Sequence, residues 1–148
     1  MRLSAKGRYG LAAMTNLAVN HSSGNPVTII SISERLGISK IYLEQVFSLL
    51  KRAQLVSSIK GSQGGYQLTR EPRDITVYDI LAAIELALIE ETGASSAGKV
   101  PELEAALSEC VYKKLDEAIL ATLSAITLED IVTETEKKKD NSSMMYFI

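Results

Sequence analysis

The chain has 148 residues, of which 46% are hydrophobic, and this suits one domain, or a small domain with an oligomerisation arm, around a buried core. Its single cysteine, Cys110, and single histidine, His21, exclude an internal disulfide and any Cys/His cluster that could bind zinc or an iron–sulfur group. No apolar run approaches the ~20 residues of a membrane span, and the basic N-terminus lacks the apolar core of a signal peptide. We therefore expect a cytoplasmic protein with no membrane partner.

Charge is distributed unevenly along the chain. Residues 1–75 contain ten Lys and Arg against four Asp and Glu, whereas residues 76–148 contain six against fourteen. A basic half joined to an acidic half indicates that the first half faces a polyanion and the second faces away from it. Chance segregation of surface charge is the alternative explanation.

The first half of the sequence predicts three helices. Apolar residues at helical spacing predict a helix from about Gly7 to Asn20, which the polar stretch HSSGNP ends. A second helix follows and can end at Gly37, because glycine tolerates the left-handed conformation. Ser39 can then cap a third helix, from about Lys40 to Ala53, which carries one apolar and one polar face.

A glycine-rich loop, GSQGG, lies between two alternating segments, Leu55–Lys60 and Gly65–Thr69, which predict a β-hairpin. A nucleotide-binding glycine loop must open a helix, and here a strand pattern follows Tyr66, so nucleotide binding is excluded. The remaining interpretations are a plain hairpin turn and a hairpin whose main chain approaches a polyanion, which glycine permits.

The second half of the sequence is predominantly helical. Thr76 begins an apolar helix that runs through Leu88. The composition of residues 92–101 then predicts a loop. A long helix from about Glu102 to Ser124 has apolar residues at every fourth position, so it can pack along its own domain or pair with a second copy. Thr127 begins a last short helix, followed by a polar tail with the apolar ending MMYFI.

Helix, glycine-containing turn, helix and hairpin is the order of a winged helix-turn-helix, whose second helix enters the major groove of DNA. Outward side chains of the third helix are of types that contact DNA: Gln45 can pair with adenine, Glu44 with the cytosine amino group, and Tyr42 with phosphate or a thymine methyl. An ion pair of Glu44 with Lys40 or Lys51 is the alternative role for that carboxylate. In the hairpin and the first helix, several side chains can contact phosphates or the minor groove: Lys60, Ser62, Gln63, Lys6 and Arg8.

Four stretches carry a family resemblance: MRLSAKGRYGLAAM, ISERLGISKIYLEQVFSLLKRAQLVSSIKGSQGGYQL, ITVYDIL and ITLEDI. Together they resemble the Rrf2 (BadM) family of bacterial transcription regulators, over nearly the whole chain. The resemblance implies a homodimer on a palindromic, double-stranded operator, usually as a repressor, with the helix at about 102–124 as the crossed dimerisation helix. It also places DNA contacts on Tyr42, Glu44, Gln45, Lys60 and Ser62–Gly64.

The predicted fold is mainly α with a small β-wing. We expect a winged helix-turn-helix domain over residues 1–75, dimerisation or regulatory helices over 76–136 and a flexible C-terminal tail over 137–148. The candidate DNA-binding residues are Lys6, Arg8, Ser39, Lys40, Tyr42, Glu44, Gln45, Arg52, Lys60, Ser62, Gln63 and Gly64. Lys40 and Ile41 precede Tyr42 where the family varies, so they can set the base preference of this chain.

One departure from the family concerns the cofactor. In the IscR and NsrR branches, three cysteines before the long helix bind an iron–sulfur cluster, whereas this chain has GASSAGKVPELEAALSEC there. We therefore predict no cofactor and a better match to the cluster-free CymR branch; a regulator of iron–sulfur or redox-stress genes acting without its cluster is the alternative. Cys110 is expected to be a small buried side chain, with a redox-sensing thiol as the alternative.

The ending MMYFI resembles the C-terminus of CymR-type proteins, which control cysteine metabolism with cysteine synthase as partner. Tyr146, Phe147 and Ile148 are the candidate partner-binding residues, because a pocket can capture an apolar end with its carboxylate. An ordinary terminus docked on the core is the alternative, and a protein-interaction module signalling through the tail is the alternative function. Catalysis is not expected, because any Ser/His/Asp or Cys/His set would need the only His or Cys.

Overall fold

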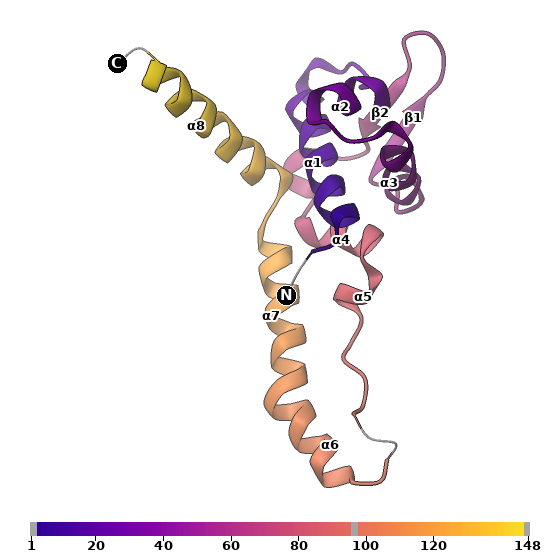
Figure 1. Ribbon diagram of the computed structural model, residues 1–148, viewed down its shortest axis with the longest axis vertical. Coiled ribbons are helices and arrows are strands. Elements are labelled where there is room, and N and C mark those ends of the chain that lie inside the picture. The colour runs from indigo at the N-terminus through magenta and orange to yellow at the C-terminus, as the bar shows by residue number, and fades with distance from the viewer. Residues whose placement is uncertain (1–2, 96–97, 147–148) are drawn as a thin grey trace.

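A computed structural model describes residues 3–95 and 98–146 (Figure 1). Helices α1 to α4 and a hairpin form a compact body, from which a helical rod extends away and a last helix projects in another direction. The predicted fold class, mainly α with a small antiparallel sheet, is confirmed. The helices are α1 (Ala5–Val19), η1 (His21–Ser23), α2 (Ile29–Leu36), α3 (Lys40–Arg52), η2 (Pro72–Asp74), α4 (Val77–Ile84), α5 (Leu86–Ile89), α6 (Pro101–Leu107), η3 (Ser108–Tyr112), α7 (Lys113–Ala125) and α8 (Leu128–Tyr146), and the strands are β1 (Val56–Ile59) and β2 (Gly65–Leu68).

Local capping defines the ends of the helices in the body. The hydroxyl of Ser39 accepts a hydrogen bond of 3.2 Å from the backbone N–H of Tyr42, so Ser39 is the N-cap of α3, as predicted. Gly37 ends α2 with a φ of 69°, in the left-handed region that its sequence position indicated. Between these two residues the chain turns sharply enough for α2 and α3 to pack against each other.

The core lies where α1, α3 and α4 meet. Its largest fully buried side chains come from these three helices, from α2, from the segment just before α4 and from the start of α8: Phe47, Met14, Ile32, Leu43, Leu50, Ile75, Ile80, Leu81, Leu128 and Val46. Backbone hydrogen bonds from Val77 N–H to Ile126 C=O (2.8 Å) and from Leu128 N–H to Ile75 C=O (2.9 Å) fasten the α7–α8 junction to the segment before α4. The base of the rod is therefore attached to the body.

The hairpin is an antiparallel pair with Ile59 opposite Gly65. Val27 adds an isolated bridge, because it exchanges two backbone hydrogen bonds with Tyr66, of 2.9 and 2.8 Å. Gly65 has a φ of 150°, and a Cβ atom there would lie 2.6 Å from the carbonyl oxygen of Val27. A Cβ atom at Gly64 would likewise collide with the backbone of Ile59. Gly64 is thus required by the turn of the hairpin, and Gly65 by the close approach of Val27 to the hairpin.

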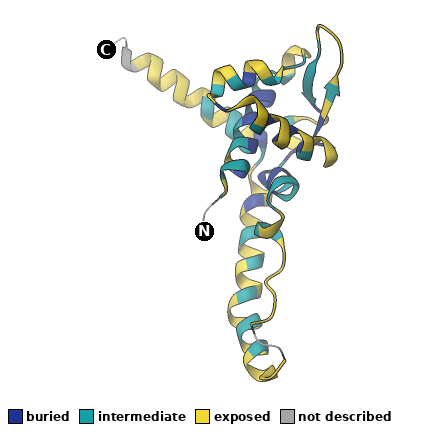
Figure 2. Ribbon diagram, turned by 45° about the vertical axis from the view of Figure 1, so that its right-hand side comes forward, coloured by how far each residue is buried: buried dark blue, intermediate teal, exposed yellow. Residues whose placement is uncertain are grey.

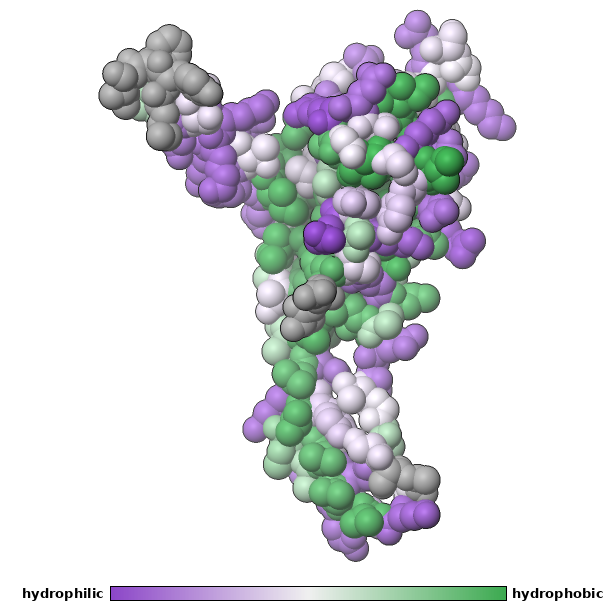
Figure 3. Space-filling view, viewed as in Figure 1, coloured by the Kyte–Doolittle hydropathy of each residue, from purple (hydrophilic) through white to green (hydrophobic). Residues whose placement is uncertain are grey.

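The predicted long helix at about 102–124 corresponds to the continuous run of α6, η3 and α7. The segment η3 is a π-helical turn that the periodicity did not indicate. Cys110 lies in this turn and is exposed, so the expectation that it is buried is wrong for the single chain. Most residues of the rod are exposed or half-buried (Figure 2), and apolar side chains gather along it (Figure 3).

Two helix boundaries differ from the predictions. The helix that starts after Thr76 is interrupted at Glu85, whose non-helical backbone (φ −117°, ψ 71°) separates α4 from α5. Residues 137–146, predicted as the start of a flexible tail, continue α8 instead, so the short last helix is a 19-residue helix. Neither Gly nor Pro occurs in residues 128–146, and Lys138 lies 3.4 Å from Glu134 one turn earlier, which supports the helix.

No helix in the described ranges, 3–95 and 98–146, is both long and apolar enough to cross a membrane. Of the three candidate partner-binding residues, Phe147 and Ile148 lie outside the described residues. Tyr146 is the last residue of α8.

We predict that Gly65→Ala destabilises the protein by about 3 kcal/mol or more, because the new methyl group combines a Gly-only backbone conformation with a collision against Val27. The measurement is the free energy of unfolding from urea titration at fixed protein concentration. Gly93→Ala is the matched control, since nothing lies within 4 Å of its Cβ position, and its change should stay within about 0.5 kcal/mol. Equal stabilities of the two variants would contradict the assignment.

Candidate nucleic-acid interface

The packing of α3 against the core determines which of its side chains point outward. Leu43, Val46, Phe47 and Leu50 are buried in the core, so the remaining side of the helix points outward. Along this side runs a shallow hollow of about 450 Å³, lined by Lys6, Ile41, Glu44, Gln45, Ser48 and Leu49. Polar side chains that pair with base edges are thus gathered on one face, beside a lysine from another helix.

The start of α1 lies beside the start of α3. The rings of Tyr9 and Tyr42 pack edge to face, with centroids 5.1 Å apart at 82°. Tyr42 is half-buried by this contact, which leaves its hydroxyl as the group suited to a phosphate. Lys6 lines the hollow and Arg8, two residues further along α1, does not. Residues two apart on a helix point in different directions, so only Lys6 adds its charge to the hollow beside α3.

Glu44 takes part in an ion pair as well as lining the hollow. Its carboxylate lies 3.9 Å from the ammonium of Lys40, and both side chains are more than half exposed. An exposed pair at this distance contributes little, so the carboxylate remains available to a base amino group. Lys51 donates a hydrogen bond of 2.9 Å to the hydroxyl of Ser58, which connects α3 with β1. Of the two lysines proposed as alternative partners, Lys40 is the one that contacts Glu44.

The hairpin is held rigidly relative to α3. The rings of Phe47 and Tyr66 pack with centroids 4.5 Å apart, so strand β2 rests on the buried side of the helix. Lys60, Ser62 and Gln63 are exposed at its tip. Gly64 is half-buried and required by the hairpin turn, which gives it an intramolecular role that does not depend on a ligand.

Ser48, on the exposed face, was not among the predicted contacts, and Ile41 was predicted only as a position that can set the base preference. Ile41 and Ser48 line the hollow together with Glu44 and Gln45, and Arg52 continues the same stripe to the end of α3, where it is exposed. The spacing i, i+4, i+7 from Ile41 was the signal that could have included Ile41 and Ser48. Ser39, a predicted contact, is occupied as the N-cap of the helix.

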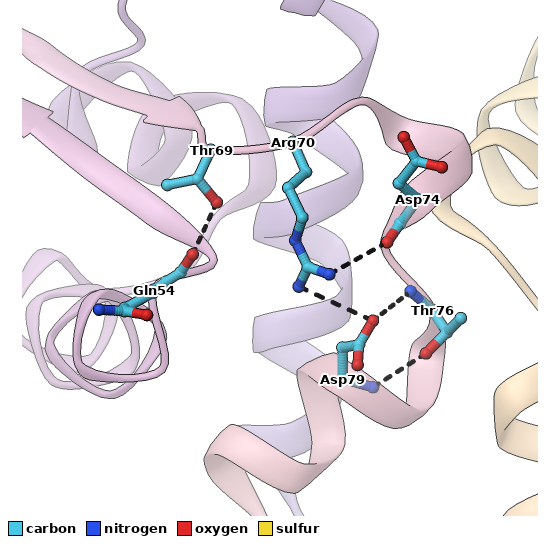
Figure 4. A network of polar contacts seen from close by, with 6 residues as sticks. All are labelled: Gln54, Thr69, Arg70, Asp74, Thr76 and Asp79. Atoms are coloured by element: carbon cyan, nitrogen blue, oxygen red, sulfur yellow. Dashed lines mark hydrogen bonds and ion pairs between the residues drawn. The ribbon is translucent and has the colours of Figure 1, made fainter.

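A polar network connects the exit of the hairpin with α4 (Figure 4). Arg70 donates to the backbone carbonyl of Asp74 at 3.3 Å, and its guanidinium lies 3.9 Å from the carboxylate of Asp79. Asp79 and Thr76 cap the start of α4 reciprocally, at 2.9 and 3.1 Å. On the other side, the hydroxyl of Thr69 donates to the carbonyl of Gln54 at 2.6 Å. Arg70 therefore joins elements of the fold, although it belongs to the basic half.

These surfaces define a DNA-binding protein of the winged helix-turn-helix type, with α3 as the recognition helix and the hairpin as the wing. Residues 3–134 match the family model Rrf2, described as an iron-dependent transcriptional regulator. The HTH-type transcriptional regulator IscR of Klebsiella pneumoniae strain 342 is 38% identical over 136 residues, which cover 92% of this chain and 82% of that protein. The chain belongs to the Rrf2 family of transcription regulators, and it is not an enzyme.

Solved structures agree with this assignment. CymR (YrzC), the global cysteine regulator of B. subtilis, matches with a TM-score of 0.75 and 35% identity, over 90% of this chain and 98% of that one. IscR of T. potens matches with a TM-score of 0.73 and 38% identity, over 93% and 90% of the two chains. The chain is therefore about as similar in structure and sequence to a CymR protein as to an IscR protein.

The residues of this chain do not fit the iron cofactor that the family description implies. A cluster is held by several thiolates, and the sequence has one cysteine, Cys110. The single histidine, His21, lies elsewhere, 3.4 Å from the carboxylate of Glu71. Within residues 3–95 and 98–146, no three His, Cys, Asp or Glu side chains are placed to hold a metal ion.

We predict that Gln45→Ala and Lys60→Ala differ in how they weaken DNA binding. Loss of the Gln45 amide should cost about 1–3 kcal/mol at one base position and relax the preference there. Loss of Lys60 should weaken all sequences about equally and reduce the slope of log K against log salt by about 1. Affinities of both variants for a panel of single-base operator changes, at two salt concentrations, test this. A uniform loss for both variants would contradict the assignment of Gln45 to base readout.

Proposed function

We propose that the chain acts as a homodimer that binds a palindromic operator and represses genes of cysteine and sulfur metabolism, as in the CymR branch. One chain presents one recognition helix and one wing, which together match a half-site. A two-fold symmetric dimer presents this face twice, and the two faces bind two half-sites related by the same symmetry, which is a palindromic operator. The observation that carries the proposal is the exposed recognition face of α3 on a body that also bears an uncovered apolar rod.

The rod supports the dimer. Large apolar side chains with exposed fractions of 40 to 55% follow one another along α6, η3 and α7: Leu103, Val111, Leu115 and Leu120. Apolar side chains exposed in a row cost free energy in water, and a second copy of the same helix would cover them. Cys110 neighbours Val111, so the same contact would change the environment of its thiol.

The cluster-free state is supported by the cysteine count and by the similarity to CymR. Cys110 cannot hold an iron–sulfur cluster alone. The IscR relatives favour the second candidate, a regulator of iron–sulfur or redox-stress genes that acts without a cluster. The CymR structure, described as that of a global cysteine regulator, favours the first.

We expect Leu115→Asp to convert the dimer to a monomer, because it places a charge in the apolar row of the rod. Affinity for a two-half-site operator should fall about a hundredfold or more with the loss of bivalent binding. Sedimentation and operator titration measure the two effects. Lys113→Asp, exposed on the same helix but two residues away, is the control and should remain dimeric. If the Leu115→Asp variant remained dimeric, this interface would be refuted.

The cluster-free state has its own test. Loss of operator binding by the parent protein after iron chelation would refute it.

Cysteine synthase is the proposed protein partner, supported by the resemblance of the ending MMYFI to CymR-type proteins. Removal of Ile148 should abolish binding to cysteine synthase, because the isoleucine side chain would be lost and the terminal carboxylate would move to Phe147, one residue earlier in the sequence. Calorimetric titration of cysteine synthase with the two forms of the chain is the measurement. Replacement of Met144, which is exposed on α8, by Ala is the control and should leave affinity unchanged. Equal affinity of the full chain and the form without Ile148 would exclude the tail as the contact.

A further inference from the structure

Ile41 is an apolar side chain in a position where the fold does not need one. Of the large apolar side chains in the described parts of the chain, it has the highest exposed fraction, 72%. It lies in the first turn of α3, two residues after the Ser39 cap, and outside the core that the opposite face of the helix forms. An isoleucine left this exposed gives up the burial free energy that it would gain in a core.

The neighbours of Ile41 show which surface it would share with DNA. Glu44, Gln45 and Ser48 follow it at helical spacing, and all line the same hollow with Lys6. Residues at the start of a recognition helix contact base edges in the major groove. Polar side chains there can pair with donors and acceptors of the bases, whereas an aliphatic side chain finds one apolar group in the groove, the 5-methyl group of thymine.

We propose that Ile41 is a specificity-determining residue that reads the methyl group of one thymine in each half-site. Successive residues of a helix rise 1.5 Å, so Ile41 precedes Gln45 by about 6 Å along the axis. That distance corresponds to one or two base steps of about 3.4 Å. The thymine therefore lies one or two base pairs from the base that Gln45 contacts. This inference rests on the proposed binding of DNA through α3, and it predicts the base at one position of each half-site.

The charge around Ile41 favours DNA over a protein as the surface that covers it. Lys6 lines the same hollow as Ile41, and Lys40 precedes Ile41 in α3. Residues 1–75 as a whole carry six more cationic than anionic side chains. A polyanion gains from these charges, whereas an apolar protein surface would have to bury them.

The test uses the full chain and duplexes selected by it from a random pool, which supply the operator. Each thymine of the selected operator is replaced in turn by uracil, which lacks only the methyl group. The parent protein should lose affinity at one position in each half-site, by about fourfold per methyl group and about sixteenfold for both. Ile41→Ala should bind the thymine and uracil forms at that position equally, and Ile41→Val should keep most of the difference.

Ile30→Ala is the matched control, because Ile30 is also an exposed isoleucine, at 54%, on the preceding helix. It should retain the full preference for thymine. The inference is overturned if the parent protein binds the operator tightly but tolerates uracil everywhere, or if Ile41→Ala keeps the thymine preference. Failure to select any sequence, or equal weak binding to all duplexes, would overturn the proposed function together with this inference.

Discussion

The recognition face of this protein depends on the burial of the opposite face of α3. Phe47 is completely buried in the core and its ring also packs against that of Tyr66 in the wing. The buried side chains of α3 thus fix the rotation of the recognition helix, and Phe47 connects that helix with the hairpin beside it. Because a packed interior tolerates little displacement, the polar side chains on the outer face are presented in one fixed arrangement. The arrangement of the side chains that face DNA therefore depends on packing in the core.

The acidic half of the chain directly contacts the start of α1, the helix that carries Lys6. Glu85, at the break between α4 and α5, accepts a hydrogen bond of 2.6 Å from the backbone N–H of Ser4, beside the N-terminus of α1. Gly7 and Gly10 allow this approach, since a Cβ atom at Gly7 would lie 2.6 Å from the Glu85 carboxylate. Lys6 lies between these glycines and Ser4 in the sequence and lines the hollow of α3. The end of α4 is therefore packed against the helix that brings Lys6 to the recognition face.

Prediction from the sequence was accurate for features that are set locally. Amphipathic spacing placed α1 and α3 correctly, Ser39 and Gly37 marked a cap and a stop, and the strand pattern after Tyr66 identified a hairpin rather than a nucleotide loop. It missed the break at Glu85, whose carboxylate accepts a hydrogen bond from Ser4, a residue far away in the sequence. It also missed the extension of α8, although the absence of Gly and Pro from residues 128–146 was a local signal for it. Charge counts could not distinguish Lys6, which lines the hollow, from Arg8, which does not.

By itself, the sequence determined which residues can form helices, where the caps and turns fall, that one cysteine cannot hold a cluster, and which family the motifs resemble. These follow from backbone preferences, residue types and periodicity, which act over a few residues. Only the tertiary structure decided which side chains share one surface. It brought Lys6 beside Gln45, gave Gly64 and Gly65 structural reasons in the hairpin turn and in the approach of Val27, and left Ile41 exposed on the recognition face. The physical reason is that burial of one helix face depends on elements distant in the chain, and the exposed face is what that packing leaves uncovered.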